Sequence, residues 1–438
     1  MLSRRKFIGI AGGVGAAGAA GGAAAWSTLL RDHVDEAVGQ RDNNIGSTDP
    51  DTTQADTPQA GATAAKGSAN RVLVVLQLSG GNDGLNTLIT SDARYRDARP
   101  TLAIPEAEVV AINASGYSLH PSLGALAPLW NQGIVTALQG IGMKDQSRSH
   151  FKAMDTWWSA TPGAASQTGW LGRWLDATEQ GQAPNPLRAV ALGGGSPALV
   201  GLRALPTVVV SPSEFSLRTP RGCDAATLTD AFLATAQPLM TDNDVFAAAQ
   251  QSFPDTIEAI EVLQKVRSQA SGQSATVRNG AQGATALLQS AAGIIEQGIG
   301  TQVILVAING FDTHADQLDR HSQLLGDVGE GIAQFVSRIQ QAGKADEVLL
   351  ITTSEFGRRV AENASVGTDH GNGSVAFVVG SGVNGGNVIG DLGIGALVDG
   401  DLPIAIDTRS LYSVALDWLG GPTDAVLGST FDRYGVLR

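Results

Sequence analysis

Five short segments of this chain place Asp, Glu, His or Ser side chains at or near the end of an apolar run or in a Gly-rich loop. They lead to Asn82-Asp83, Ser147–His150, Asp312–His314 and Ser354-Glu355, and the fifth is the loop Thr368–Gly371. A parallel strand that is buried on both faces reads as a continuous apolar run, and ligands collect outside the carboxyl ends of such strands. Carboxylates with neutral imidazoles suit one or two divalent metal ions. The pattern predicts one site assembled from distant parts of the sequence.

The strongest pair of candidate metal ligands is Asp312 with His314. Residues two apart on an extended segment point to the same side, so a carboxylate and an imidazole can share one metal ion. The alternative is a surface histidine oriented by a carboxylate. Gln317 and His321 lie one and two turns further along the chain and could cap or orient.

A second acidic and imidazole pair, Asp369-His370, lies in a Gly-rich loop. It offers two adjacent ligands, or one ligand with a partner that orients it. Asp83 follows the pair Gly80-Gly81, which lets the backbone turn so that a short carboxylate can face a ligand. The segment around Asp83 could equally be an ordinary turn.

Glu355 follows an apolar strand that ends near Ile351, and its carboxylate can bind a metal. Arg358 or Arg359 could hold a tetrahedral oxyanion through a bidentate fork. A salt bridge between Glu355 and one of these arginines is the alternative interpretation.

Ser147 and Ser149 lie between a predicted strand and a predicted helix. Serine is a preferred residue at a helix N-cap. The start of a helix also concentrates amide donors and positive dipole, so a serine there can act as a nucleophile beside a bound oxyanion. The two roles are compatible.

The elements that position these residues alternate between strand and helix. Strands are expected near 71–78, 135–138, 303–306, 348–351 and 375–379, and helices near 121–130, after Ser149 and over 321–342. An Ala- and Gln-rich stretch at about 224–298 is expected to be a helical insertion. The predicted fold is α/β, with a doubly wound, mostly parallel sheet and helices on both faces.

The amino terminus carries the signature of an export signal. Arg4 and Arg5 form a twin-arginine pair, and a Gly/Ala-rich stretch then leads to an Ala-x-Ala cleavage pattern that ends at Ala25. The stretch 9–22 is about half Gly and too short to span a bilayer, which needs ~20 predominantly apolar residues. A removed export signal is therefore favoured over a membrane anchor. We expect a signal peptide at 1–25, a flexible linker at 26–70 and one domain at 71–438, located in the periplasm or outside the cell.

The composition excludes some partners. The chain has 29 basic and 42 acidic residues, and without Arg4, Arg5 and Lys6 the basic total is 26. A protein this acidic lacks the electrostatic footprint of a nucleic-acid binder. The single cysteine, Cys223, cannot form an intramolecular disulfide.

Several motifs together resemble an exported bacterial family known as domain-of-unknown-function family fifteen-oh-one. The motifs are Leu76–Asn86, Arg148–Phe151, Gly169–Leu175, Gly310–His314, Ser354–Arg358 and Gly367–Gly371. The family is grouped with the alkaline-phosphatase-like superfamily, so the resemblance implies a two-metal site and a nucleophile at a helix start. It implies metal ligation by Asp83, Asp312, His314, Glu355 and His370, with Asp369 beside His370, and a nucleophilic Ser149 or Ser147.

Two departures limit this resemblance. The superfamily usually has an Asp-His pair where this chain has Ser354-Glu355, so one imidazole ligand is missing there. No Cys or Ser is followed by Pro and Arg at the spacing that formylglycine maturation needs, which argues against sulfatase activity by that route.

The expected function is an exported metal-dependent hydrolase of phosphate or sulfate esters in small molecules or glycans. One or two divalent ions (Zn, Mn, Mg or Ca) would serve as cofactor, and Arg148 or Arg358 would hold the non-transferred oxygens. The alternatives are a metal-free serine esterase and a non-catalytic envelope protein that retains the fold. The twin-arginine export machinery is the expected protein partner.

Replacement of both Arg4 and Arg5 by Lys is expected to leave the precursor in the cytoplasm, because the export pathway reads the arginine pair. Cell fractionation and immunoblotting of precursor and mature forms measure this. Mature protein outside the cytoplasm of a strain that lacks the pathway would contradict the assignment.

Overall fold

The computed structural model describes residues 70–163, 166–179, 185–212, 216, 219, 221–234, 244–269, 277–278 and 281–438. The predicted signal peptide and all but the last residue of the predicted linker lie outside these residues. The chain divides into two compact units, one of residues 1–63 and 216–254 and one of residues 64–215 and 255–438. Every candidate site residue belongs to the second unit.

The second unit is built on a nine-stranded, mostly parallel sheet with the order β15-β5-β14-β11-β1-β10-β6-β7, and β16 also pairs with β5. The strands are β1 (Val72–Ser79), β5 (Val135–Gly142), β6 (Ala189–Leu192), β7 (Thr207–Val209), β10 (Val303–Asn309), β11 (Val348–Thr353), β14 (Ser374–Val379), β15 (Val388–Ile389) and β16 (Ile406–Asp407). Strand β14 runs antiparallel to both β11 and β5, and the other pairs are parallel. The prediction of a mostly parallel sheet is confirmed.

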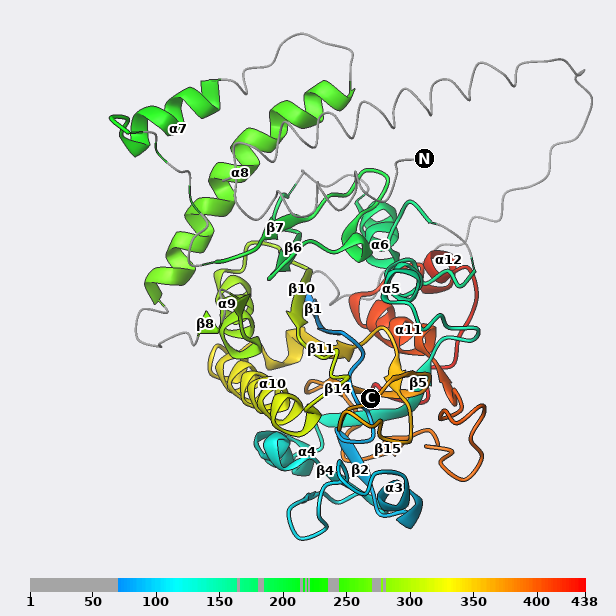
Figure 1. Cartoon of the computed structure of the whole chain (residues 1–438). Coiled ribbons are helices and arrows are strands. Elements are labelled where there is room, and N and C mark those ends of the chain that lie inside the picture. Colours follow the sequence, from blue (N-terminus) through cyan, green and yellow to red (C-terminus); the bar gives the residue numbers. More distant parts are fainter. Residues whose placement is uncertain are drawn as a thin grey trace, which may run out of the picture. The chain divides into compact units, whose positions relative to one another are not determined.

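Helices cover both faces of this sheet (Figure 1). One core cluster contains Val74 and Leu76 of β1, and the other contains Leu73 and Val75, because successive side chains of a strand point to opposite faces. The first cluster includes η2 (Pro121–Leu126), α4 (Ala127–Asn131), α9 (Ala284–Gln297) and α10 (Gln317–Gln341); the second includes α5 (His150–Ser159), α6 (Trp170–Thr178), α11 (Thr408–Leu419) and α12 (Thr423–Leu427). The doubly wound arrangement is therefore also confirmed.

The stretch 224–298, which is expected to be a helical insertion, is divided between the two units. Helix α7 (Ala225–Ala234) and the first part of α8 (Asp244–Gln269) belong to the first unit. Helix α9, in contrast, buries Leu287, Leu288 and Ile294 in a core cluster of the sheet. Apolar residues at helical spacing do not reveal which core they pack into, so the helical insertion at about 224–298 stays a prediction.

The remaining short elements are not part of the main sheet. They are β2 (Leu88–Thr90), α3 (Ala93–Ala98), β3 (Val110–Ala111), β4 (Tyr117–Leu119), η3 (Pro197–Leu199), β8 (Val277–Arg278), β9 (Ala281–Gln282), η4 (Ala345–Glu347), β12 (Gly357–Arg358) and β13 (His370–Gly371). Strands β12 and β13 pair with each other antiparallel. No helix among the described residues is long and apolar enough to cross a membrane.

Three adjacent parallel strands bring the candidate residues to one edge of the sheet. Strand β1 lies between β10 and β11, so the segments after Ser79, Asn309 and Thr353 emerge together. Gly80 makes this convergence possible. Its φ of +122° is one that side-chain-bearing residues rarely adopt, and a Cβ there would overlap the backbone N of Asp312 and lie 2.7 Å from the carbonyl carbon of Phe311.

Gly80→Ala is expected to lower the free energy of unfolding by about 2–5 kcal/mol, because it combines a strained φ with overpacking against the Asp312 segment. Denaturant unfolding measures the loss. Gly163→Ala is the matched control, since Gly163 has a φ of +75° with nothing within 4 Å of the added Cβ. Equal losses in the two variants would show that the close approach to Asp312 costs nothing.

Candidate metal centre

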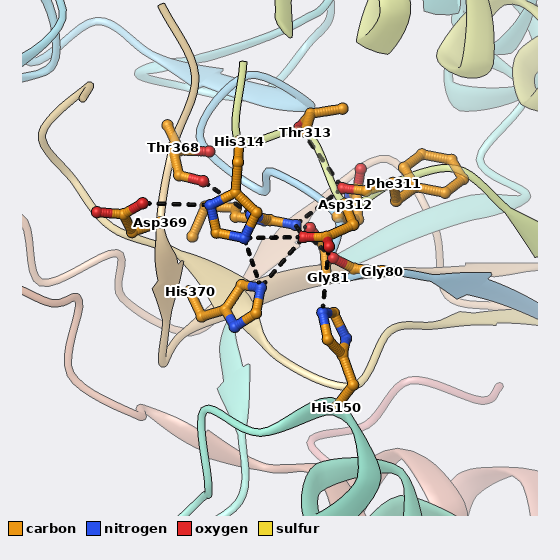
Figure 2. Close-up of polar contacts among 12 residues, drawn as sticks. Gly80, Gly81, His150, Phe311, Asp312, Thr313, His314, Thr368, Asp369 and His370 are labelled. Atoms are coloured by element: carbon orange, nitrogen blue, oxygen red, sulfur yellow. Dashed lines mark hydrogen bonds and ion pairs between the residues drawn. The ribbon is translucent and has the colours of Figure 1, made fainter. Parts of the chain in front are cut away.

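The candidate centre forms where three segments meet at the carboxyl edge of the sheet. Asp312 and His314 follow β10, His150 is the first residue of α5, and His370 is the first residue of β13. Figure 2 shows that His150 approaches Asp312 from one side, while His314 and His370 approach it from the other. Three of the five histidines in the described part of the chain meet here.

The three histidines turn Nε2 toward the Asp312 carboxylate. His314 Nε2 lies 3.0 Å and His370 Nε2 3.1 Å from Oδ1, and His150 Nε2 lies 3.4 Å from Oδ2. The Nε2 atoms of His314 and His370 are 2.9 Å apart. Among the described residues, potential ligand atoms of His150, Asp312 and His370 all lie within 4.8 Å of one another.

Each of these rings has its other nitrogen, Nδ1, bonded to a different group. His150 Nδ1 is 2.9 Å from Glu355 Oε1, and His314 Nδ1 is 3.2 Å from Asp369 Oδ1. His370 Nδ1 is 2.7 Å from the backbone carbonyl oxygen of Arg148. Because each of these partners accepts hydrogen bonds, each ring can donate from Nδ1, and its Nε2 lone pair would then be free to bind a metal ion. Metal-binding histidines are commonly oriented in this way.

These donors fit a first-row divalent metal. Ligand bonds of about 2.0–2.1 Å in a tetrahedral site place donor atoms about 3.3–3.4 Å apart. The closest donor contacts around Asp312, 2.9 to 3.4 Å, are close to that range. Imidazole nitrogen suits zinc, copper, iron or nickel, whereas magnesium and calcium prefer oxygen.

Electrostatics keep the central carboxylate ionised. Partial burial opposes ionisation of Asp312, but hydrogen bonds from Arg358 and His370 and the nearby positive charge lower its pKa to about 2. Burial lowers the pKa of His370, which favours its neutral form. A hydrogen bond from Asn363, aided by His314, lowers the pKa of Asp369. The site therefore offers an anionic oxygen and a neutral imidazole at neutral pH.

The structure places Glu355 and Asp369, both predicted as metal ligands, against the Nδ1 atoms of His150 and His314, on the sides of these rings that face away from Asp312. Glu355 is buried, and its Oε1 also accepts a hydrogen bond of 2.7 Å from the backbone N–H of Gly80. Asp369 is exposed and contacts the side of His314 that faces away from Asp312 (Figure 2). Each carboxylate orients an imidazole in this arrangement. His150 is a further candidate ligand that the sequence analysis did not single out; its place after a strand and at a helix start was the available signal.

Arg358, predicted to hold substrate oxygens, is fully buried and binds the protein itself. Its Nε donates to Gly81 O at 2.7 Å and its Nη1 to Thr368 O at 2.8 Å. Its Nη2 contacts Gly80 O, Phe311 O and, at 2.8 Å, Asp312 Oδ1. With every guanidinium nitrogen so engaged, Arg358 holds three loops together and is not placed to bind an anion.

The structure does not bring Asp83, predicted as a metal ligand, to the candidate centre. Its Oδ2 forms an ion pair of 2.7 Å with Arg99 Nη1, and both side chains are almost completely buried. Oδ2 also accepts a hydrogen bond from Gln317, and Oδ1 accepts one from the backbone N–H of Asn86. Burial opposes ionisation, but Arg99 lowers the pKa of Asp83 below its ordinary value. Its acceptor capacity is used inside the protein.

The two candidate nucleophiles lie next to the centre. Ser149 is the exposed N-cap residue of α5, and its side chain makes no capping hydrogen bond. Ser147 Oγ accepts a hydrogen bond of 3.2 Å from the Ser149 backbone N–H. The Arg148 side chain is 41% exposed and contacts the buried Asp401, which also lies 3.7 Å from Arg359 Nε. Arg148 is thus a partly exposed cation at the edge of the centre.

Two further histidines, His120 and His321, are buried and are not part of the candidate centre. His321 Nε2 is 2.9 Å from Asn82 Oδ1, and its Nδ1 has no hydrogen-bond partner in the described part of the chain. His120 Nδ1 accepts a hydrogen bond from the Ser122 backbone N–H and caps η2. Burial lowers the pKa of His321 to about 3 and that of His120 to about 4. Both rings are neutral in the folded protein.

Fold and site together define an α/β protein with a histidine-rich candidate metal centre at the carboxyl edge of its sheet. The chain belongs to the family described as "Protein of unknown function (DUF1501)", whose model matches residues 110–396. Strand β1 and Asp83 precede the matched residues. No curated protein matches the chain.

Several solved structures are distantly similar. The lipoteichoic acid synthase LtaP from Listeria monocytogenes is 9% identical, with 84% of this chain and 77% of that chain covered and a TM-score of 0.37. A protein in the alkaline phosphatase superfamily from Vibrio parahaemolyticus is 11% identical, with 82% and 69% covered and a TM-score of 0.40. The periplasmic domain of EcEptC from Escherichia coli in complex with Zn is 10% identical, with 82% and 84% covered and a TM-score of 0.38. Likenesses this distant indicate no function.

Protonation of the buried histidines is expected to make stability fall as pH decreases. Both pKa values are lower in the folded state than the ordinary 6.5, so below pH 6.5 the unfolded chain binds more protons. The free energy of unfolding should therefore decrease from pH 6.5 toward pH 4, by up to about 1.4 kcal/mol per pH unit for each histidine. Denaturant unfolding at several pH values measures this slope.

His120→Asn is the matched variant, because Asn also accepts the capping hydrogen bond of η2 but does not titrate. Its slope should be shallower than that of the wild type. An unchanged slope would show that His120 contributes nothing to the pH dependence.

Proposed function

We propose that this chain is an exported, metal-dependent hydrolase of phosphate or sulfate esters. The observation that supports this most strongly is the orientation of three histidines, whose Nε2 atoms converge around Asp312 while their Nδ1 atoms are bonded elsewhere. Both nitrogens of each ring face hydrogen-bond acceptors, whereas a neutral imidazole has only one N–H, so a metal ion among the Nε2 atoms would complete the arrangement.

The proposed centre holds one metal ion through His150, Asp312 and His370, with His314 beside them as a fourth donor. The nitrogen-rich donor set favours zinc over magnesium or calcium. When bound, such an ion supplies a Lewis acid that polarises a phosphoryl or sulfuryl oxygen. A second ion at Asp83, as implied by the superfamily resemblance, is not part of this proposal because Arg99 occupies that carboxylate.

The chain's own residues supply the remaining parts of the proposed reaction. Ser149 Oγ forms a bond to the phosphorus or sulfur atom while the bond from that atom to the ester oxygen breaks. The proton of the serine hydroxyl ends on the departing alcohol. Water then attacks the covalent serine ester, which releases phosphate or sulfate and returns a proton to the serine oxygen. The first backbone N–H groups of α5, which receive no hydrogen bond from the N-cap side chain, and the Arg148 guanidinium can bind the non-transferred oxygens.

The open surface of the centre suits a large substrate such as a glycan ester. The side chains of Asp312 and His314 are 46% and 43% exposed, so a substrate group can approach without a prior opening of the protein. Export to the periplasm or beyond rests on the twin-arginine signal, which lies outside the described residues.

Ser149→Ala is expected to reduce hydrolysis of aryl phosphate or sulfate esters by several orders of magnitude, with metal content unchanged. The loss in stability should be at most ~1 kcal/mol, because Ser149 makes no side-chain capping bond. Ester hydrolysis, elemental analysis and denaturant unfolding measure the three quantities separately.

Ser147→Ala is the control two residues away and should remain active. Loss of activity in Ser147→Ala alone would move the nucleophile to Ser147. A wild-type protein that hydrolyses esters after complete removal of metal by a chelator would support the metal-free serine esterase. A metal-loaded wild type inert toward a broad panel of esters would support the non-catalytic alternative.

A further inference from the structure

One buried side chain links the two segments that carry most of the candidate ligands. Gln317, the first residue of α10, is completely buried. Its Oε1 accepts a hydrogen bond of 3.0 Å from Thr313 Oγ1 and one of 2.7 Å from Thr368 Oγ1. Thr313 lies between Asp312 and His314, and Thr368 directly precedes Asp369 and His370.

The orientation of the Gln317 amide is fixed from the opposite side. Its Nε2 donates to Asp83 Oδ2, and a carboxylate accepts hydrogen bonds but donates none. Arg99 holds that carboxylate at 2.7 Å. A flipped amide would place two oxygens in contact at Asp83 and leave both threonine hydroxyls facing an N–H₂ group. The amide oxygen is therefore committed to the two threonines.

We propose that Gln317 is a positioning residue for the metal centre, setting the separation of the Asp312–His314 segment from the Asp369-His370 segment. The inference rests on the proposed function, because it assigns a role toward the metal ion of that site. It also gives Asp83 a role, as the group that orients the amide from behind the centre.

The contacts of the two segments support a specific role for the side chain. Backbone hydrogen bonds also join the two stretches of chain. The Thr368 N–H donates to Thr313 O at 3.2 Å, and the Asp316 and Gln317 N–H groups donate to Ser365 O and Val366 O at 3.1 and 2.9 Å. Of these bonds only the first reaches a residue between Asp312 and His314, and Arg358 adds bonds to Thr368 O and Asp312. The Gln317 amide oxygen adds one bond to a threonine side chain of each segment, directly beside the candidate ligands. The 2.9 Å separation of the Nε2 atoms of His314 and His370 depends on how these two segments are held.

The test is the affinity of the purified full chain for Zn²⁺, measured by competition with a chelating dye, together with the stability of the metal-free protein. Gln317→Met keeps the length of the side chain and removes the hydrogen bonds of the amide oxygen to the two threonines and of the amide nitrogen to Asp83. We expect its Kd for Zn²⁺ to rise 10- to 100-fold, the range seen when groups that orient metal ligands are removed. Thr313→Val and Thr368→Val each remove one hydroxyl and should give smaller rises, so the result does not depend on the folding of one variant.

Thr136→Val is the matched control. Thr136 is also completely buried, and its hydroxyl bonds to Asn387 on the other side of β14 from the central strands. This variant should lose stability and keep the wild-type Kd within about twofold. Wild-type Kd values in all three link variants would overturn the inference while leaving the proposed metal site intact. A wild type that binds no Zn²⁺ would overturn the proposed metal site and the inference together.

Discussion

The guanidinium of Arg358 is the constraint on which the candidate centre depends. A single buried cation binds carbonyl oxygens from the loop after β1, the loop after β10 and the loop before β13, and it also binds Asp312. An unpaired buried charge is costly, and so are unpaired buried carbonyl groups. The buried guanidinium therefore needs the carbonyl groups, and the carbonyl groups need the guanidinium. The three loops depend on Arg358 for this arrangement.

The residues around Arg358 form two layers with different roles, a partly exposed outer layer and a buried inner layer. The outer layer, formed by Asp312 and the three histidines, is partly open to solvent and can change partners when a ligand arrives. The inner layer, which includes Asp83, Arg99 and Gln317, is buried and has its polar groups bonded within the protein. Reactive groups can thus remain exposed while their positions are set by groups that solvent does not reach.

The sequence predicted the central strands and part of the site, for identifiable physical reasons. Strands β1, β10 and β11 are buried on both faces, so they are continuous apolar runs, and Asp312 and His314 could be read from their place after one of them. The role of Arg358 could not be read, because most of its partners are backbone carbonyl groups, which every residue has. The contact of Asp83 with Arg99 could not be read from the sequence either, because an ion pair between distant segments leaves no periodic pattern.

The position of β1 in the sheet has a consequence for synthesis of the chain. Its two neighbours, β10 and β11, are encoded more than about 230 residues later. At roughly 5–20 residues per second on the ribosome, β1 waits on the order of ten seconds or more before a partner strand exists. During that interval an eight-residue apolar strand has both edges unpaired. Unpaired apolar strand edges can pair with other chains, so this segment carries a risk of aggregation until β10 has been made.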